Sequence, residues 1–154
     1  MSRGRVIVTV GIEFYGQQPA RDMLETAGLE CIHSPGSPGW PDDETRDNIR
    51  DKFGILAGAE LLDASTMADA RDLRVIARNG VGFDRVDLDY CTERGIVVTN
   101  TPGAMADAVA DLTLALLLGT VRHLVTGNVN VMTGDEYDVP MGEDLASLTL
   151  GMIG

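Results

Sequence analysis

The sequence has little of what metal, disulfide and nucleic-acid sites require. Its 154 residues include 2 histidines and 2 cysteines, and Cys31 and Cys91 lie too far apart to form a CxxC pair, so a zinc site has no readable set of ligands. A disulfide is not needed by a domain that can bury its own core, and reduced thiols are expected. Only 12 Lys and Arg stand against 24 Asp and Glu, and the net charge of −12 argues against nucleic acid and anionic membranes as partners.

Long hydrophobic runs are also missing. The longest, residues 112–121, is shorter than the roughly 20 apolar residues that cross a bilayer. The apolar stretch near the N-terminus is too short and too β-branched for a secretion signal. These absences predict a soluble, cytoplasmic protein.

What the sequence does contain is an alternation of short apolar runs with helical stretches. Continuous apolar runs separated by helices indicate a parallel α/β sheet that is covered on both faces. We expect strands over 5–10, 29–32, 53–57, 73–77 and 95–99, and helices over 19–27, 44–51, 59–70 and 86–94.

After Thr99 the pattern changes. Following a turn at 100–103, residues 104–123 are expected to form a helix that is apolar on nearly every side, so a second domain or a second subunit has to cover it. A polar, acidic loop is predicted over 133–147. Residues 148–153 resemble a new buried strand with no partner left in the sequence, which suggests that a further part is missing.

The fourth predicted strand runs directly into a glycine-containing loop, Arg78-Asn79-Gly80-Val81-Gly82. In a parallel sheet this loop lies at the carboxyl edge, where ligands bind. Two glycines allow a tight turn whose N–H groups suit a carboxylate or phosphate, and Arg78 and Asn79 can add side-chain donors.

The alternative is an ordinary strand-to-helix turn in which Asp84 caps a helix starting near Val86. Under the ligand-binding interpretation, the same helix would add its dipole. The loop does not carry a dinucleotide-binding fingerprint, because Arg85 stands where the third glycine would be.

Four segments together resemble the D-isomer-specific 2-hydroxyacid dehydrogenases: LRVIARNGVGFDRVDLD (73–89), CTERGIVVTNTPG (91–103), AVADLTLALLL (108–118) and LTLGMIG (148–154). The resemblance implies a flavodoxin-like substrate-binding domain over 1–102. It also implies that 103–154 hold a connector and dimerisation helix, followed by the first strand of a truncated NAD(P)-binding Rossmann domain.

The resemblance also implies roles for single residues. The backbone around Val81 and Gly82 would hold the substrate carboxylate, and Val81 would approach the cofactor. Met105 stands where relatives often have an asparagine, and Gly154 would be the first glycine of the phosphate-binding turn. Gly58-Ala59 replace an Arg-Ser pair near the substrate phosphate of phosphoglycerate dehydrogenases, which disfavours a phosphorylated substrate without excluding it. The catalytic Arg, Glu and His are expected beyond Gly154.

Two functions follow from this interpretation. The first is an NAD- or NADP-dependent oxidoreductase that oxidises the CH–OH group of a small D-2-hydroxy acid, or reduces the 2-keto acid, as a homodimer joined through helix 104–123. The second is a non-catalytic chain that binds substrate and dimerises. Neither function involves a metal.

Overall fold

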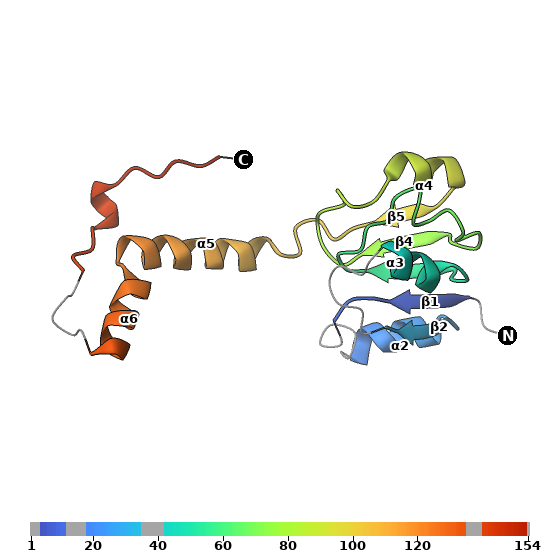
Figure 1. The fold of residues 1–154 in the computed structure, drawn as a ribbon, viewed down its shortest axis with the longest axis horizontal. Coiled ribbons are helices and arrows are strands. Elements are labelled where there is room, and N and C mark those ends of the chain that lie inside the picture. Colours follow the sequence, from blue (N-terminus) through green and yellow to red (C-terminus); the bar gives the residue numbers. More distant parts are fainter. Residues whose placement is uncertain (1–3, 12–17, 35–41, 135–139, 154) are drawn as a thin grey trace. The chain divides into compact units, whose positions relative to one another are not determined.

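The computed structural model describes residues 4–11, 18–34, 42–134 and 140–153 (Figure 1). The chain divides into two compact units, residues 1–104 and 105–154. The first unit is an α/β domain and the second is helical.

A parallel sheet of five strands organises the first unit. Its strands run in the order β2-β1-β3-β4-β5, and every neighbouring pair is parallel. The order reverses between β1 and β3, as in flavodoxin-like folds, and confirms the predicted fold class. The strands are β1 (Arg5–Val8), β2 (Glu30–His33), β3 (Gly54–Ala57), β4 (Val75–Arg78) and β5 (Val97–Thr99).

Helices pack on both faces of this sheet. Ile49 of α3 (Asp42–Ile49) and Cys91 of α4 (Leu88–Arg94) join the main core, which includes the strand residues Ile7, Ile55 and Ile76. On the other face, α2 (Gln18–Thr26) places Leu24 against Val8 and Val10. Each aliphatic side chain buried in this way contributes about 1.5–3 kcal/mol.

The helix predicted over 59–70 is not formed. Leu62 makes an isolated parallel bridge with Val86, in which its N–H donates to the carbonyl of Arg85 at 2.8 Å and its carbonyl accepts from the N–H of Asp87 at 2.9 Å. An extended residue of this kind cannot continue a helix. The Asp63 carboxylate then accepts from the N–H groups of Ser65 and Thr66, at 3.0 and 2.8 Å, which closes a turn instead.

The second unit contains α5 (Ala106–Val121), α6 (Leu124–Thr133) and a short 3₁₀ turn at Leu145–Ser147. The predicted long helix is therefore present, but it ends before His123, which has a left-handed backbone with φ of 51°, and α6 was not predicted. The strand predicted over 148–153 is not formed, and these residues have no regular secondary structure.

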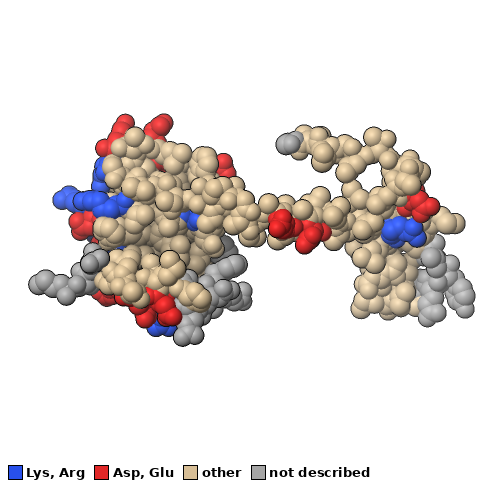
Figure 2. Space-filling model, turned by 180° about the vertical axis from the view of Figure 1, so that it is seen from behind, with Lys and Arg blue, Asp and Glu red and all other residues tan. Residues whose placement is uncertain are grey.

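The surface of α5 and α6 is unusually apolar for exposed helices. No residue of α5 is buried within its own unit, and Leu116 is 61% exposed. The charged side chains of residues 105–134 are Asp107, Asp111 and Arg122, so most of the surface of α5 and α6 is uncharged in Figure 2. No single described helix is long and apolar enough to cross a membrane, although α5 and α6, bent by 60° at their junction, reach such a length and composition when counted together.

Candidate functional site

The loop that follows β4 leaves the sheet at its carboxyl edge. The N–H of Asn79 donates to the carbonyl of Ala57 at 2.9 Å, which continues the pairing of β4 with β3 by one residue. Gly80 then takes φ of 154°, a conformation that L side chains rarely adopt. The first loop glycine therefore has a backbone reason to be glycine.

The carbonyl groups of this loop are all held by neighbouring residues. Gly80 accepts from the N–H of Thr101 at 3.0 Å, and Val81 accepts from the Asn100 side-chain amide at 2.8 Å. The carbonyl of Gly82 accepts from Nε of Arg78 at 3.2 Å. Three carbonyls in a row are thus turned toward the protein and fixed there.

The N–H groups of the same loop residues are left available. Among the described residues, the amides of Gly80, Val81 and Gly82 donate no hydrogen bond to any acceptor. Successive backbone N–H groups in a turn can bind an anionic oxygen. We define Gly80-Val81-Gly82 as the amide loop; the arrangement can hold a carboxylate.

The two side-chain donors predicted beside the amide loop, Arg78 and Asn79, have different surroundings. Arg78 uses Nε to fix the Gly82 carbonyl, while its Nη1 atom is buried without a partner among the described residues. The Asn79 side chain is exposed and makes no hydrogen bond within the described residues.

The predicted helix cap at Asp84 is wrong. Helix α4 starts at Leu88, and its N-cap is Asp87, whose side chain accepts from the N–H of Tyr90 at 2.9 Å. Asp84 is therefore not the cap, and α4 begins two residues later than the predicted start near Val86. Asp84 instead brings its carboxylate beside Gly82, with Oδ2 3.4 Å from where a Cβ would stand.

Three residues of this edge were missed by sequence reasoning. Asn100 and Thr101, which hold the loop carbonyls, directly follow β5 and lie at the same edge of the sheet. Their position directly after a predicted strand was the one feature of the sequence that could have indicated this role. Glu60, which is 1% exposed, follows β3 and gives no sign in the sequence that it is buried.

The residues predicted to contact a cofactor belong to different units. Val81 is 47% exposed on the first unit, and Met105, at the start of the second, is 52% exposed. Gly154 lies outside the described residues.

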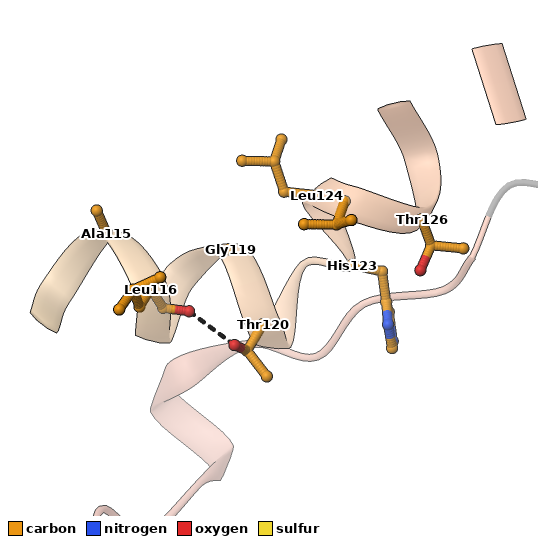
Figure 3. Close-up of a pocket in the computed structure, with 8 residues that line it drawn as sticks. Ala115, Leu116, Gly119, Thr120, His123, Leu124 and Thr126 are labelled. Carbon is orange, nitrogen blue, oxygen red and sulfur yellow. Dashed lines mark hydrogen bonds between the residues drawn. The ribbon is translucent and has the colours of Figure 1, made fainter. Parts of the chain in front are cut away.

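Other parts of the described chain offer weaker sites. A cavity of about 440 Å³ lies between α5 and α6 and is mostly apolar; Leu116, His123 and Leu124 line it (Figure 3). A second, of about 480 Å³, lies at the opposite edge of the sheet from the amide loop and includes Arg5 and Asp51. No group of three or more potential metal ligands occurs in the described residues.

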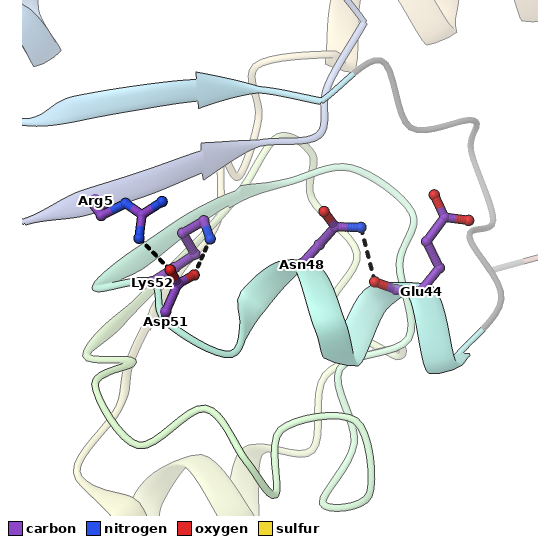
Figure 4. Close-up of polar contacts among 5 residues, drawn as sticks. All are labelled: Arg5, Glu44, Asn48, Asp51 and Lys52. Atoms are coloured by element: carbon purple, nitrogen blue, oxygen red, sulfur yellow. Dashed lines mark hydrogen bonds and ion pairs between the residues drawn. The ribbon is translucent and has the colours of Figure 1, made fainter.

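Three charged residues at that opposite edge pair with one another. Arg5 and Lys52 both contact the carboxylate of Asp51 (Figure 4). The hydrogen bond from Lys52 is the largest influence that lowers the pKa of Asp51. This edge is a stabilising ion-pair cluster, in contrast to the unpaired donors of the amide loop.

Comparison with known proteins agrees with the resemblance noted in the sequence. Residues 7–150 match the profile of the D-isomer specific 2-hydroxyacid dehydrogenase, catalytic domain. A glyoxylate reductase of Thermofilum pendens is 36% identical over 163 residues, which cover 100% of this chain and 46% of that protein. The chain thus spans about half the length of this curated relative.

Solved structures of other proteins share the fold of this chain. A protein of Thermus thermophilus superposes with a TM-score of 0.79 and 36% identity, over 92% of this chain and 45% of that one. The NADPH-dependent glyoxylate/hydroxypyruvate reductase of Sinorhizobium meliloti, solved with NADP and malonate, has a TM-score of 0.69 and 28% identity, over 92% and 42% of the two chains.

Proposed function

Because the chain belongs to the D-isomer specific 2-hydroxyacid dehydrogenase family, we propose that the intact protein is a nicotinamide-dependent oxidoreductase of small 2-hydroxy and 2-keto acids. The observation that carries this proposal is the amide loop, in which three carbonyls are fixed and three N–H groups are left for a carboxylate. The reductase names of the relatives favour reduction of a keto acid such as glyoxylate or hydroxypyruvate.

In this proposal the chain binds and orients the acid. The amides of Gly80, Val81 and Gly82 hold its carboxylate, so the C2 carbon is presented in a fixed direction. Such positioning can remove several kcal/mol from a reaction barrier. A nicotinamide cofactor, NAD or NADP, supplies the hydride when bound; Val81, Met105 and Gly154 are the residues of this chain that we propose contact it.

Replacement of Gly82 tests the binding role. Its backbone has an ordinary φ and room for a Cβ, so Gly82→Val leaves the loop fold intact while its branched side chain crowds the anion. We expect KM for glyoxylate and hydroxypyruvate to rise at least about tenfold, with kcat less affected. Gly127→Val on α6, where a Cβ meets nothing, is the control. Unchanged KM in Gly82→Val would contradict the proposal.

The second candidate function, a non-catalytic chain, is distinguished by mass and activity. A purified natural protein of 16.4 kDa with no NADH or NADPH oxidation would favour it. A protein about twice as large that reduces glyoxylate or hydroxypyruvate would exclude it.

We also propose that a second copy of the chain covers α5. Four of the five leucines of α5 are exposed, and such an apolar helix surface is expected to be buried against another apolar surface. Sedimentation of the intact protein should show a homodimer, and Leu116→Glu should shift it toward monomer, whereas Asp107→Asn should not. A wild-type monomer would mean that another part of the same chain covers α5. A cytoplasmic location remains a prediction.

A further inference from the structure

The sequence contains a single Asn-Gly pair, and its glycine is the first residue of the amide loop. An asparagine that precedes glycine is the one most prone to lose its side-chain ammonia, because no Cβ on the next residue hinders attack by the backbone nitrogen. Every other asparagine of the chain precedes a β-branched residue, whose side chain crowds that nitrogen. These pairs are Asn48-Ile49, Asn100-Thr101, Asn128-Val129 and Asn130-Val131.

The two groups that react in such a loss of ammonia are both unengaged in Asn79-Gly80. The Asn79 side chain is exposed and makes no hydrogen bond within the described residues. The N–H of Gly80 donates to no acceptor in the same part of the chain. Most backbone N–H groups of a folded protein are paired, and a paired N–H has to break its hydrogen bond before its nitrogen can attack. The Gly80 nitrogen is therefore open to deprotonation by hydroxide.

The backbone on either side of these two groups is anchored. The N–H of Asn79 donates to the carbonyl of Ala57 at 2.9 Å, and the carbonyl of Gly80 accepts from the N–H of Thr101 at 3.0 Å. Neither bond uses the Asn79 side chain or the Gly80 nitrogen. The nucleophile and its target are neighbours in one chain, and such an intramolecular reaction proceeds at a high effective concentration.

Other asparagines of the described chain lack this combination. Asn128 is also exposed, but it lies within α6, where the next N–H belongs to the helix. Asn100 precedes Thr101, whose N–H donates to Gly80. An exposed side chain and an unpaired next N–H thus occur together at Asn79, which separates it from asparagines that are only exposed.

We propose that Asn79 is a site of spontaneous deamidation. The deprotonated Gly80 nitrogen forms a bond to Cγ of Asn79, the bond from Cγ to Nδ2 breaks, and Nδ2 takes a proton from water and leaves as ammonia. Water then opens the five-membered succinimide, adding its hydroxyl to one of the two ring carbonyl carbons and a proton to the ring nitrogen. Opening at Cγ gives aspartate, and opening at the main-chain carbon gives isoaspartate. No oxidant or reductant takes part.

Both products change the amide loop. Each places a carboxylate next to Gly80, and isoaspartate also lengthens the main chain by one methylene directly before the loop. Under the proposed function, on which this consequence rests, the new charge repels the substrate carboxylate. Conversion of Asn79 should then raise KM and make the enzyme lose activity with age.

Incubation of the intact protein at mildly alkaline pH tests the proposal. Peptide mapping by mass spectrometry follows each asparagine, and released ammonia is assayed in parallel. We expect Asn79 to convert at least about tenfold faster than Asn128, the exposed internal control, because a β-branched residue follows Asn128. Conversion should accelerate as pH rises, since hydroxide generates the nucleophile. Asn79→Gln should release no matching ammonia, because its longer side chain does not close the same ring.

The modification and the proposed function fail in different ways. Absence of conversion at Asn79, or equal conversion at Asn79 and Asn128, overturns the modification and leaves the proposed function standing. Neither result depends on the folding of a variant. Faster conversion at Asn79 supports the modification; if KM for glyoxylate then stays constant while Asn79 converts, the carboxylate is not held at this loop and the proposed function is contradicted.

Glycolate with NADH, whose reduced state prevents turnover of a hydroxy acid, adds a second distinction. A carboxylate that accepts from the Gly80 N–H should slow the conversion of Asn79 relative to NADH alone. Slowing supports both proposals, because the same nitrogen would then bind the acid and attack Asn79. Conversion at an unchanged rate supports the modification and contradicts binding of the acid by Gly80.

Discussion

Asn100 is the residue whose replacement most directly tests how the amide loop is held. Its side-chain amide donates to the carbonyl of Val81 at 2.8 Å, and Asn100→Ala removes that bond alone, because the bond from Thr101 to Gly80 uses the backbone. A side-chain hydrogen bond is worth about 0.5–1.5 kcal/mol net. The bond is exposed, so water can replace the lost donor, and the lower part of that range applies.

The expected effect is an increase of about threefold in KM with kcat nearly unchanged, at about 1.4 kcal/mol per factor of ten. The carboxylate is bound equally in the ground state and the transition state, which is why KM carries the loss. Asn100→Asp should be more severe. It turns a donor into an anion that faces the Val81 carbonyl and repels the substrate carboxylate, which adds a further cost of about 1 kcal/mol or more.

Steady-state kinetics of the intact enzyme with glyoxylate or hydroxypyruvate measure both effects. Asn128→Ala and Asn128→Asp are the matched controls, because Asn128 is an exposed asparagine of α6 that takes no part in the amide loop. Equal effects at Asn128 and Asn100 would refute the idea that a side-chain clamp orders the loop. An Asn100→Asp enzyme whose KM is no higher than that of Asn100→Ala would also refute this idea.

Three further predictions concern stability and reactivity. Gly80→Ala should lower the unfolding free energy by about 1–3 kcal/mol in urea titrations because of its φ of 154°, whereas Gly151→Ala, where a Cβ meets nothing and φ is ordinary, should not. Hydrogen bonds from Thr66, and secondarily from Ser65, lower the pKa of Asp63 below its ordinary value of 3.8. Asp63→Ala should therefore lower the unfolding free energy by about 1 kcal/mol at pH 7. The difference in unfolding free energy between wild type and variant should disappear as the pH falls through this lowered pKa, because the wild-type carboxylate then becomes protonated. A pH-independent difference would contradict that cause. Burial, and secondarily Asp87, raises the pKa of the Cys91 thiol, so iodoacetamide at mildly alkaline pH should label Cys31 first by mass spectrometry; equal rates would show that Cys91 is accessible.

The sheet could be predicted because its information is local. Runs such as Arg5–Val8 and Val75–Arg78 combine β-branched residues with clear ends, so each strand was identified from its own residues. The region 59–70 failed for the opposite reason. Its apolar residues Leu62 and Met67 are buried as expected, but the conformation of Leu62 is decided by pairing with Val86, which no local pattern reveals.

In the candidate site, too, local features could be predicted from the sequence and long-range contacts could not. The amide loop was identifiable because a glycine pair directly follows a predicted strand. The predicted role of Arg78 was incomplete, since one of its nitrogens serves the loop itself rather than a ligand. Asn100 could not be assigned, because its bond to Val81 spans 19 residues and depends on which strands are neighbours.

That dependence makes the β4–β5 register part of the binding site. Ala77 pairs with Thr99, so the next residues along the chain, Asn100 and Thr101, arrive beside the amide loop and fix two of its carbonyls. A slip of one residue would exchange the faces of the strand and move both donors away. The buried Ile96, just before β5, opposes such a slip, because the slip would take its side chain out of the core. The residues that pack the sheet thereby also set the direction in which the loop N–H groups point.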